Sequence, residues 1–296
     1  MKINKLLYAG AALTLLGACA PAVKAPEAIL PVPEEKQVEW QKMETYAFVH
    51  FGLNTFNDRE WGYGDSDPKT FNPSKLDCEQ WVKTFVESGM KGVILTAKHH
   101  DGFCLWPTEL TEYCIRNTPY KDGKGDIVSE LAAACKKYGI KFAVYLSPWD
   151  RHQANYGTPE YVDYFHKQLT ELMTNYGEVF EVWFDGANGG DGWYGGAKDS
   201  RTIDRKTYYN YPRIYEILDK LQPQAIVFSD GGPGCRWVGN ENGLPELPTG
   251  RSCGRAKCIR AIRNIANCNT DTLTVTNGYR QNVMSLSVRD GFIIRK

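Results

Sequence analysis

Five short apolar runs recur between residues 45 and 230, and amphipathic stretches separate them. Apolar residues fill these runs almost continuously, which is typical of strands buried on both faces of a parallel sheet. The pattern predicts an α/β domain, and it fits both a (β/α)8 barrel and a doubly wound sheet. The predicted strands cover residues 45–51, 92–97, 141–146, 179–184 and 225–229.

Helices are predicted between the strands from their caps and their apolar faces. Asp77 and Asp126 are suited to be N-caps, and Gly89 and Gly139 follow the last turns of the same two helices. A Gly-rich loop precedes the last predicted helix. The residues predicted to face inward are Trp81, Phe85 and Val86; Ile127, Leu131, Cys135 and Tyr138; Val162, Phe165, Leu169, Leu172, Met173 and Tyr176; and Tyr211, Ile214, Tyr215, Leu218 and Leu221.

Polar side chains gather directly after the predicted strands. His50 ends the first strand, residues 98–101 follow the second, residues 147–150 follow the third, and Asp185 ends the fourth. The carboxyl ends of the strands form the catalytic face of a TIM barrel, whereas no G-x-G-x-x-G fingerprint of a dinucleotide-binding fold follows the first strand. We therefore predict a TIM-like (β/α)8 barrel that is incomplete, with about five β/α units.

The charge balance and the cysteines exclude several classes of protein. The 296-residue chain has 35 Lys or Arg and 35 Asp or Glu, so its net charge of +0 gives no support for nucleic-acid binding. A hydrophobic content of 42% excludes a disordered chain. No C-x-x-C pair occurs among the nine cysteines, and Cys135 falls on an apolar helix face, so we expect neither a zinc site nor a required disulfide.

The first residues resemble the signal of a bacterial lipoprotein. Two lysines precede an apolar segment, residues 6–16, that is too short for an ordinary membrane-spanning helix. A Leu-Gly-Ala-Cys sequence ending at Cys19 is similar to a lipobox, and a plain secretory signal is the alternative. We expect residues 1–19 to be the signal and residues 20–37 a Pro-containing linker. The protein would then be lipid-anchored in the cell envelope, in the periplasm or on the outer membrane surface of a Gram-negative bacterium.

Asp185 and Glu241 are candidate catalytic carboxylates. Asp185 ends a hydrophobic strand beside aromatic residues, and Glu241 follows Trp237 in a loop that contains Gly and Asn. One carboxylate as nucleophile and a second as proton donor are what glycoside hydrolysis requires. The alternative is that Asp185 caps a helix or turn and that Glu241 is a solvated loop charge.

His50, His99 and His100 are the second candidate site. Three histidines at adjacent strand ends are suited to a metal, but consecutive residues of an extended strand point to opposite faces, and no further ligand stands at metal-binding spacing. Neutral imidazoles also hydrogen-bond well with sugar hydroxyl groups. We therefore expect these histidines to bind a sugar, with no metal.

Four ordered motifs resemble family 29 glycoside hydrolases, the retaining α-L-fucosidases. They are FVHFG at 48–52, KHHDGF at 98–103, WFDG at 183–186 and WVGNE at 237–241. The resemblance covers about residues 38–244, which would form the N-terminal part of the catalytic barrel.

The resemblance also implies the role of each candidate residue. Asp185 would be the nucleophile and Glu241 the acid/base of a double displacement, and no cofactor is needed. The Gly-Asn-Glu loop resembles that of the subgroup that cleaves α-1,3 and α-1,4 fucose linkages in branched glycans. The residues that would line the fucose pocket are His50, Glu60, Trp61, His99, His100, Tyr145 and Trp237.

Residues 245–296 differ from the rest of the chain. They contain nine Lys or Arg, three Asp or Glu, two aromatic residues and no convincing helix or strand periodicity. A shift of reading frame near Leu244 and Pro245 would permit codons for a segment ending in VSIRPGWFYH, which resembles a C-terminal motif of the same family. A native basic tail is the alternative. We expect an out-of-frame tail, five strands where a barrel needs eight, an unpaired edge at the fifth strand and little or no activity.

Three functions remain open from the sequence. The first is a lipid-anchored α-L-fucosidase that acts on fucosylated oligosaccharides or glycoconjugates. The second is a non-catalytic fucose-binding surface lipoprotein, and the third is a misfolded fragment. The presence of both Asp185 and Glu241 favours the enzyme, because a binding protein needs neither carboxylate.

Overall fold

The computed structural model describes residues 32–185, 190–204 and 207–229, and the backbone of three further strands at 235–236, 284–289 and 292–295. The chain divides into two compact units, Met1–Val32 and Pro33–Lys296. The fold described below is that of the second unit. The predicted signal, including Cys19, lies outside the described residues.

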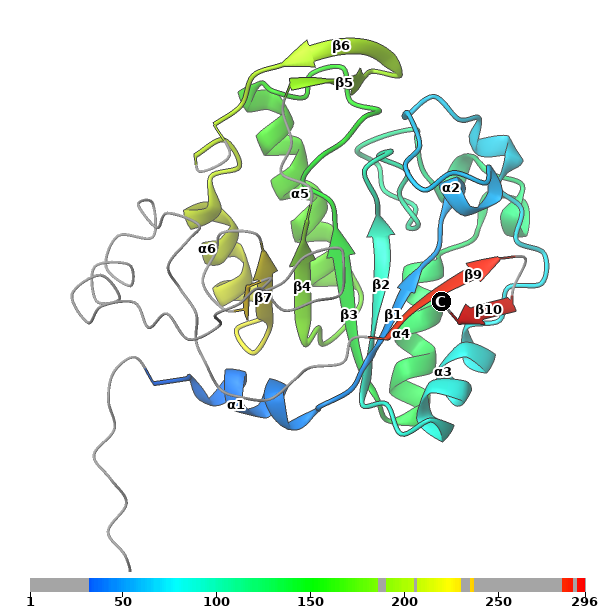
Figure 1. Cartoon of the computed structure of the whole chain (residues 1–296), viewed down its shortest axis with the longest axis vertical. Coiled ribbons are helices and arrows are strands. Elements are labelled where there is room, and N and C mark those ends of the chain that lie inside the picture. Colours follow the sequence, from blue (N-terminus) through cyan, green and yellow to red (C-terminus); the bar gives the residue numbers. More distant parts are fainter. Residues whose placement is uncertain are drawn as a thin grey trace, which may run out of the picture. The chain divides into compact units, whose positions relative to one another are not determined.

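Eight strands form one mostly parallel sheet (Figure 1) in the order β10-β9-β1-β2-β3-β4-β7-β8. The five predicted strands are adjacent in this order, and each pairs in parallel with the next. The prediction of an α/β domain with a parallel sheet is therefore confirmed. These strands are β1 (Ala47–His50), β2 (Gly92–Lys98), β3 (Lys141–Leu146), β4 (Glu181–Phe184) and β7 (Ile226–Ser229).

The prediction of only five strands is wrong. β8 (Cys235–Arg236) pairs with β7, so β7 is not the edge of the sheet, and β9 (Met284–Arg289) pairs in parallel with β1. β10 (Phe292–Arg295) runs antiparallel to β9. β9 has the alternating sequence Met-Ser-Leu-Ser-Val-Arg, a strand signal that is easily missed in a short basic segment. β8 and β10 stand at the two ends of the order, so the described strands form an open sheet.

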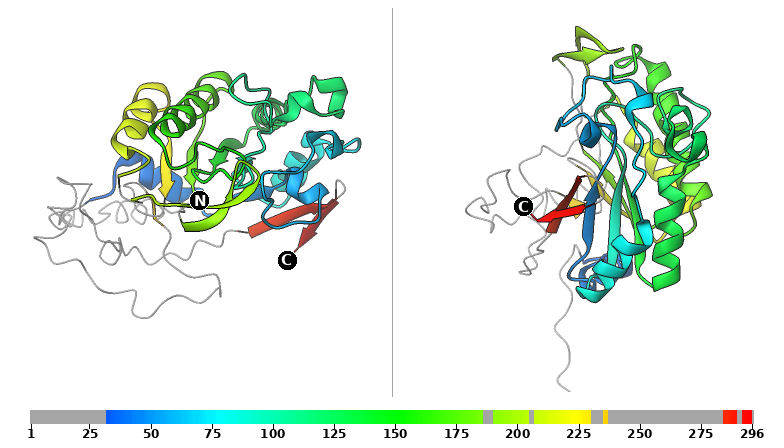
Figure 2. Two further views of the ribbon diagram at one scale, coloured as in Figure 1. Left: turned by 90° about the horizontal axis from the view of Figure 1, so that it is seen from above. Right: turned by 90° about the vertical axis from the view of Figure 1, so that its right-hand side faces the viewer.

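Helices cover one face of this sheet (Figure 2). The predicted N-caps are present, since Asp77 Oδ1 accepts a hydrogen bond from Gln80 N at 3.0 Å and Asp126 Oδ1 accepts one from Ser129 N at 2.9 Å. Gly139 ends its helix in the left-handed conformation, with φ of 73°. The longer helices are α1 (Glu35–Lys42), α3 (Cys78–Glu87), α4 (Ile127–Tyr138), α5 (Pro159–Asn175) and α6 (Tyr211–Leu221), and the short ones are α2 (Leu53–Phe56), η1 (Pro68–Thr70), η2 (Ile115–Asn117) and η3 (Tyr120–Gly123).

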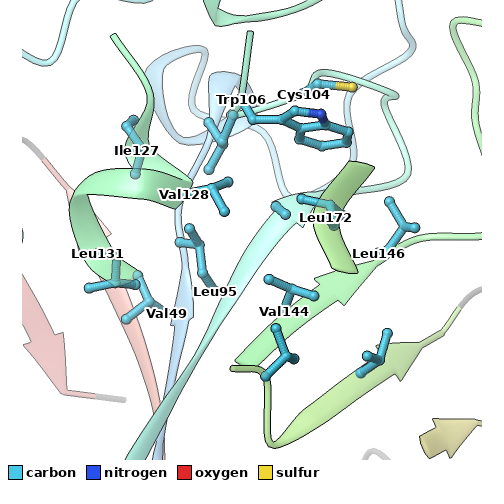
Figure 3. Packing of buried hydrophobic residues seen from close by; sticks show 14 of the residues in the cluster. Val49, Leu95, Cys104, Trp106, Ile127, Val128, Leu131, Val144, Leu146 and Leu172 are labelled. Atoms are coloured by element: carbon cyan, nitrogen blue, oxygen red, sulfur yellow. The ribbon is translucent and has the colours of Figure 1, made fainter. Parts of the chain in front are cut away.

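Both faces of the strands are buried, in agreement with their continuous apolar sequences. Val49, Leu95 and Val144 point toward the helices and pack against Ile127 and Leu131 of α4 (Figure 3). A second, more aromatic cluster covers the other face of the same strands. Its members are Trp40, Met43, Tyr46, Phe48, Ile94, Ala143, Tyr145, Phe180, Trp183 and Ile226.

Two local predictions fail. Val86 was placed on the inner face of α3, but it is 36% exposed, because Trp81, Val82 and Phe85 already fill that face. The predicted Gly-rich loop contains a hairpin, β5 (Gly190–Tyr194) and β6 (Ala197–Arg201), that lies beyond the carboxyl ends of β3 and β4 (Figure 1). Gly195 and Gly196 allow its tight turn, because both have positive φ.

None of the helices in the described ranges has the length and apolar character that a membrane span requires. Cys78, Cys104, Cys114 and Cys135 are buried free thiols, as predicted for Cys135.

Candidate active site

The candidate residues lie at the carboxyl ends of four neighbouring strands. His50 ends β1, His99 and His100 follow β2, Tyr145 is the penultimate residue of β3, and Asp185 follows β4. Because β1 to β4 are parallel, their carboxyl ends meet at one edge of the sheet. The sheet therefore brings together residues that are up to 135 positions apart in the sequence.

The three histidines form a stack. The ring centroids of His50 and His99 are 4.5 Å apart with the rings perpendicular, and those of His99 and His100 are 4.0 Å apart with an interplanar angle of 29°. The prediction that His99 and His100 point to opposite faces of a strand is wrong. β2 ends at Lys98, and the chain then turns, with Gly102 N donating to His99 O at 3.1 Å.

The hydrogen bonds of Ser147 assign the tautomer of His100. Ser147 Oγ donates its single hydrogen to Trp149 O at 2.7 Å, and it lies 2.7 Å from His100 Nδ1. Nδ1 must therefore carry the proton, which leaves Nε2 as a hydrogen-bond acceptor. Burial, followed by the charges of His50, Arg151 and Lys98, lowers the pKa of His100 to about 3. The ring is neutral at pH 7.

His99 is also neutral. Burial and the neighbouring His100 and His50 hold its pKa well below the usual value. Within the described part of the chain, three buried polar atoms, His99 Nδ1, Asn54 Oδ1 and Asp101 Oδ2, have no hydrogen-bond partner, and their residues line one small cavity. Burial and the charge of Asp150 raise the pKa of Asp101 to about 7. The floor of the site therefore holds polar atoms with unused hydrogen-bonding capacity.

Asp185 is oriented by a neighbouring tyrosine. Tyr145 is 3% exposed, and its hydroxyl donates to Asp185 Oδ2 at 3.2 Å. The Tyr145 ring stacks on Trp183 with centroids 6.2 Å apart. A buried hydroxyl on a rigid strand thus fixes a partly exposed carboxylate, which is the geometry that a nucleophile requires.

Trp183 is held from below by a buried carboxyl that the sequence analysis did not identify. Trp183 Nε1 donates to Glu181 Oε1 and Trp40 Nε1 donates to Glu181 Oε2, both at 2.6 Å. Burial raises the pKa of Glu181 to about 7. Glu181 therefore links α1 to the aromatic layer under Tyr145.

Glu60 and Trp61 lie at the outer side of the histidine stack. The Trp61 ring meets the His100 ring edge-on at 5.6 Å and remains 49% exposed. Glu60 is exposed beside it. Trp237 and Glu241 lie outside the described residues, so their predicted roles stay predictions.

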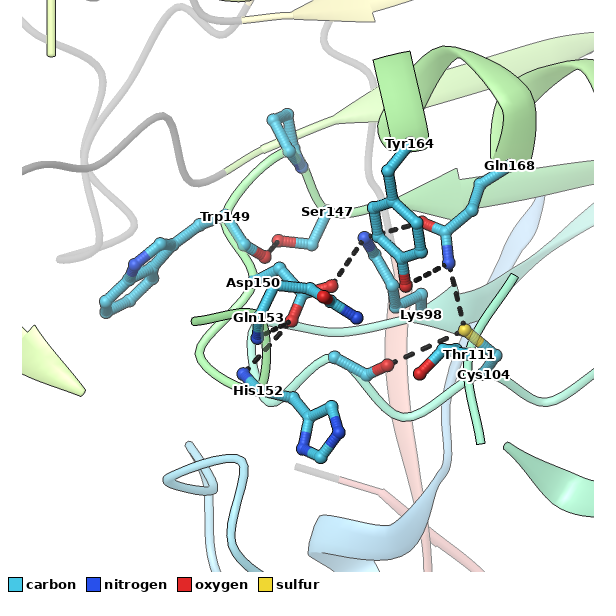
Figure 4. A network of polar contacts seen from close by, with 12 residues as sticks. Lys98, Cys104, Thr111, Ser147, Trp149, Asp150, His152, Gln153, Tyr164 and Gln168 are labelled. Carbon is cyan, nitrogen blue, oxygen red and sulfur yellow. Dashed lines mark hydrogen bonds and ion pairs between the residues drawn. The ribbon is translucent and has the colours of Figure 1, made fainter. Parts of the chain in front are cut away.

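An ion pair that sequence reasoning missed joins the end of β2 to the loop after β3 (Figure 4). Lys98 Nζ lies 3.1 Å from Asp150 Oδ2 and 2.8 Å from Gln168 Oε1, and the side chains of Lys98 and Asp150 are 0% exposed. Asp150 Oδ1 also accepts from the backbone N–H groups of His152 and Gln153, at 3.0 and 3.1 Å. The positions of Lys98 at the end of β2 and of Asp150 in the loop after β3 were a usable signal, but their mutual contact could not be read from spacing.

The histidine stack is not arranged as a metal site, and no group of three His, Cys, Asp or Glu side chains in the described ranges could hold a metal ion. Two neutral imidazoles, a tyrosine hydroxyl, a carboxylate and an exposed tryptophan are instead suited to bind a sugar through its hydroxyl groups and its apolar face.

Comparisons with known proteins agree with this chemistry. The family model described as Alpha-L-fucosidase matches residues 28–211. Alpha-L-fucosidase 1 of Arabidopsis thaliana is 48% identical over 220 residues, which are 74% of this chain and 41% of that protein. A crystal structure of a glycoside hydrolase 29 family member from an unknown rumen bacterium is 59% identical, with a TM-score of 0.68, and the match covers 72% of this chain and 39% of that one.

A third relative is a Ruminococcus gnavus GH29 fucosidase whose structure was determined in complex with fucose. It is 30% identical with a TM-score of 0.67, and the match covers 90% of this chain and 56% of that one. This chain spans about two fifths of the length of the curated relative from Arabidopsis. The matched family model covers more than half of the chain, and the chain belongs to the alpha-L-fucosidase family.

Proposed function

We propose that this chain is part of a retaining α-L-fucosidase that removes terminal α-linked L-fucose from oligosaccharides or glycoconjugates. The observation that carries the proposal is the Asp185 carboxylate, which accepts a hydrogen bond from Tyr145 and shares a strand-end face with the neutral rings of His99 and His100. Family membership supports the same activity. The linkages that we propose are α-1,3 and α-1,4.

The proposed reaction is a double displacement. Asp185 attacks the anomeric carbon of fucose, the bond to the leaving oxygen breaks, and Glu241 protonates that oxygen. Glu241 then removes a proton from water, the water oxygen attacks the anomeric carbon, and the bond to Asp185 breaks. The Tyr145 hydroxyl stabilises the Asp185 carboxylate before the first step and after the second. Neutral histidines exchange hydrogen bonds with the fucose hydroxyl groups without a competing positive charge.

Residues 245–296 bear on how this proposal is tested. We propose that they are read out of frame, on the basis of their excess of basic residues and their few aromatics. Sequencing the coding DNA across Leu244 tests this directly, because restoring one base must open the segment that ends in VSIRPGWFYH. The expected activities are little or no turnover of an aryl α-L-fucoside by the 296-residue chain, and turnover by the frame-restored chain.

Trapping the covalent intermediate tests the nucleophile. 2-Deoxy-2-fluoro-L-fucosyl fluoride reacts to a fucosyl-enzyme that hydrolyses slowly, because the fluorine destabilises the positively charged transition state. We expect peptide mass spectrometry of the frame-restored chain to locate the label on Asp185. Asp185→Asn should prevent labelling, whereas Asp191→Asn, which changes an exposed carboxylate on β5, should not. Fucose binding without labelling would instead favour the non-catalytic binding protein.

We also propose that the protein is anchored to the cell envelope through lipid on Cys19. Metabolic labelling with a fatty acid tests this, since Cys19→Ser should remove the label and release the protein from membranes. A wild-type protein that carries no fatty acid would contradict the anchor without affecting the proposed activity.

A further inference from the structure

Two aromatic residues beside the histidine stack have no role in the proposed chemistry. The rings of Tyr63 and Trp193 are stacked with centroids 4.5 Å apart and an interplanar angle of 28°. Tyr63 is 37% exposed and Trp193 is half-buried. We call this pair the aromatic rim. It joins the loop after α2 to the β5–β6 hairpin, two segments about 130 residues apart.

The aromatic rim is continuous with the candidate fucose site. Trp149 packs against both His100, at 5.2 Å between ring centroids, and Trp61, at 5.9 Å. Arg151 joins Trp149 to the aromatic rim. Its guanidinium carbon lies 4.8 Å from the centre of the Trp149 ring and 5.1 Å from that of the Tyr63 ring. The His100 and Trp149 rings, the Arg151 guanidinium and the Tyr63 ring therefore connect the histidines to Trp193.

The pleat of the hairpin explains why Trp193 is available. Successive side chains of a strand point to opposite faces. Tyr194 is 3% exposed and stacks on Tyr156 with centroids 5.3 Å apart, so it faces the protein core. Trp193 therefore lies on the opposite face of β5, where it meets Tyr63.

Hydrogen bonds hold the rim in place. Gly196 N, in the hairpin turn, donates to Arg151 O at 3.2 Å. Arg151 Nη1 in turn donates to Gly62 O at 2.6 Å, directly before Tyr63. The Arg59 guanidinium also lies over the Tyr63 ring, 5.0 Å from its centre. The aromatic rim is thus held in place by hydrogen bonds of the buried Arg151, with the exposed Arg59 guanidinium at its edge, so little entropy is lost when a ligand binds to it.

Its chemistry fits a sugar ring. The apolar face of a pyranose packs on aromatic rings, while guanidinium groups donate to its hydroxyl groups. A fucose bound between the histidines and Trp61 is attached to a second sugar, and that sugar must occupy the surface next to the fucose site. The aromatic rim is such a surface, because Trp149 packs against His100 and is joined to Tyr63 by the Arg151 guanidinium.

We propose that Tyr63 and Trp193 form a subsite for the sugar residues to which fucose is attached, so that the site selects fucosylated oligosaccharides over simple fucosides. This inference rests on the proposed function, and it adds a specificity-determining surface to it. Trp193 would supply binding energy for the neighbouring sugar and would leave the fucose contacts unchanged.

Calorimetric titration of the full chain with two ligands tests the subsite. The ligands are L-fucose and a trisaccharide with fucose linked α-1,3 to the N-acetylglucosamine of N-acetyllactosamine. We expect Trp193→Ala to raise the Kd of the trisaccharide about tenfold, which corresponds to about 1.4 kcal/mol, and to leave the Kd of fucose within about twofold. Trp193→Phe should retain most of the affinity, because it keeps an aromatic ring. Val86→Ala, which truncates an exposed side chain on α3, is the distant control.

The outcomes separate this inference from the proposed function. Equal affinities of the wild-type chain for fucose and the trisaccharide would overturn the subsite alone. Equal losses for both ligands in Trp193→Ala would also overturn it, since they would indicate a general structural effect. If the wild-type 296-residue chain binds neither ligand, the subsite is overturned for this chain, whereas the proposed function is decided separately by the labelling of Asp185 in the frame-restored chain.

Discussion

Lys98 and His99 are neighbours in the chain, yet they belong to polar clusters of opposite kinds. Around Lys98, an ammonium group, the Asp150 carboxylate and the Gln168 amide are 0% exposed and satisfy one another's hydrogen bonds. Around His99, the His99 and His100 rings are neutral, and a buried nitrogen has no partner within the described residues. The first cluster contains a buried ion pair, and the second contains buried imidazole rings that carry no charge at pH 7.

The difference shows that one cluster stabilises the fold around the site and the other provides groups that can bind a ligand. The Lys98–Asp150 pair ties the end of β2 to the loop after β3, so this interaction stabilises the fold and is not available to a ligand. His99 and His100 lie in the loop after β2 and keep unused hydrogen-bond donors and acceptors for a ligand. Arg151 N donates to His100 O at 2.8 Å, which couples the two clusters through the backbone.

Breaking the ion pair is expected to have the largest effect. Lys98→Met leaves Asp150 as a buried charge without its cation, which costs about 3–5 kcal/mol of unfolding free energy. Urea unfolding followed by tryptophan fluorescence measures the loss. The control is Lys137→Met, which removes an exposed partner of Glu79 at 2.6 Å and should cause no resolvable change. Equal unfolding midpoints for Lys98→Met and the wild type would show that the pair does not hold the loops.

Acid is expected to destabilise the fold through the histidine cluster. His100 titrates at about 3 in the folded state and near 6.5 when unfolded, so the unfolded state binds more protons between these values. The contribution of the neutral His100 ring to the free energy of unfolding is therefore fully present above pH 6.5, and it is lost as the pH falls toward 3. From pH 7.5 to pH 5 the loss is about 2 kcal/mol for His100 alone, and His99 acts in the same direction. In His100→Asn this part of the pH dependence should disappear, and an unchanged profile would contradict the neutral assignment.

His100→Asn also separates binding from stability. The Asn amide can take the place of Nδ1–H and donate to Ser147, but it has no equivalent of Nε2. We expect fucose affinity to fall about tenfold, equivalent to one hydrogen bond of about 1.4 kcal/mol, while the unfolding midpoint at pH 7.5 stays close to that of the wild type. A loss of stability as large as that of Lys98→Met would place His100 in the structural cluster instead.

Local and periodic features of this fold were predictable from the sequence. The caps at Asp77 and Asp126 and the five central strands were read from patterns that act within a few residues. The strand ends also indicated which residues meet, because parallel strands carry His50, Tyr145 and Asp185 to one edge.

Features that depend on pairing at a distance were missed. β9 is specified by its partner β1 as much as by its own alternating sequence. The stacking of His99 on His100 follows from where β2 stops, and a strand boundary is poorly defined by propensity. The Lys98–Asp150 and Trp40–Glu181 contacts arise only when separate segments pack, so no spacing rule could reveal them.

Tyr145→Phe is expected to have the smallest effect on stability, and it tests whether Tyr145 serves the site or the fold. Tyr145→Phe removes the hydroxyl that donates to Asp185 Oδ2 at 3.2 Å but keeps the ring that stacks on Trp183. Asp185 is partly exposed, so water can replace the lost donor, and the unfolding free energy should change by less than about 1 kcal/mol. Labelling of Asp185 in the frame-restored chain should nevertheless slow, because the carboxylate loses its fixed orientation. Unaltered labelling, or destabilisation comparable to that of Lys98→Met, would mean that Tyr145 serves the fold and not the site.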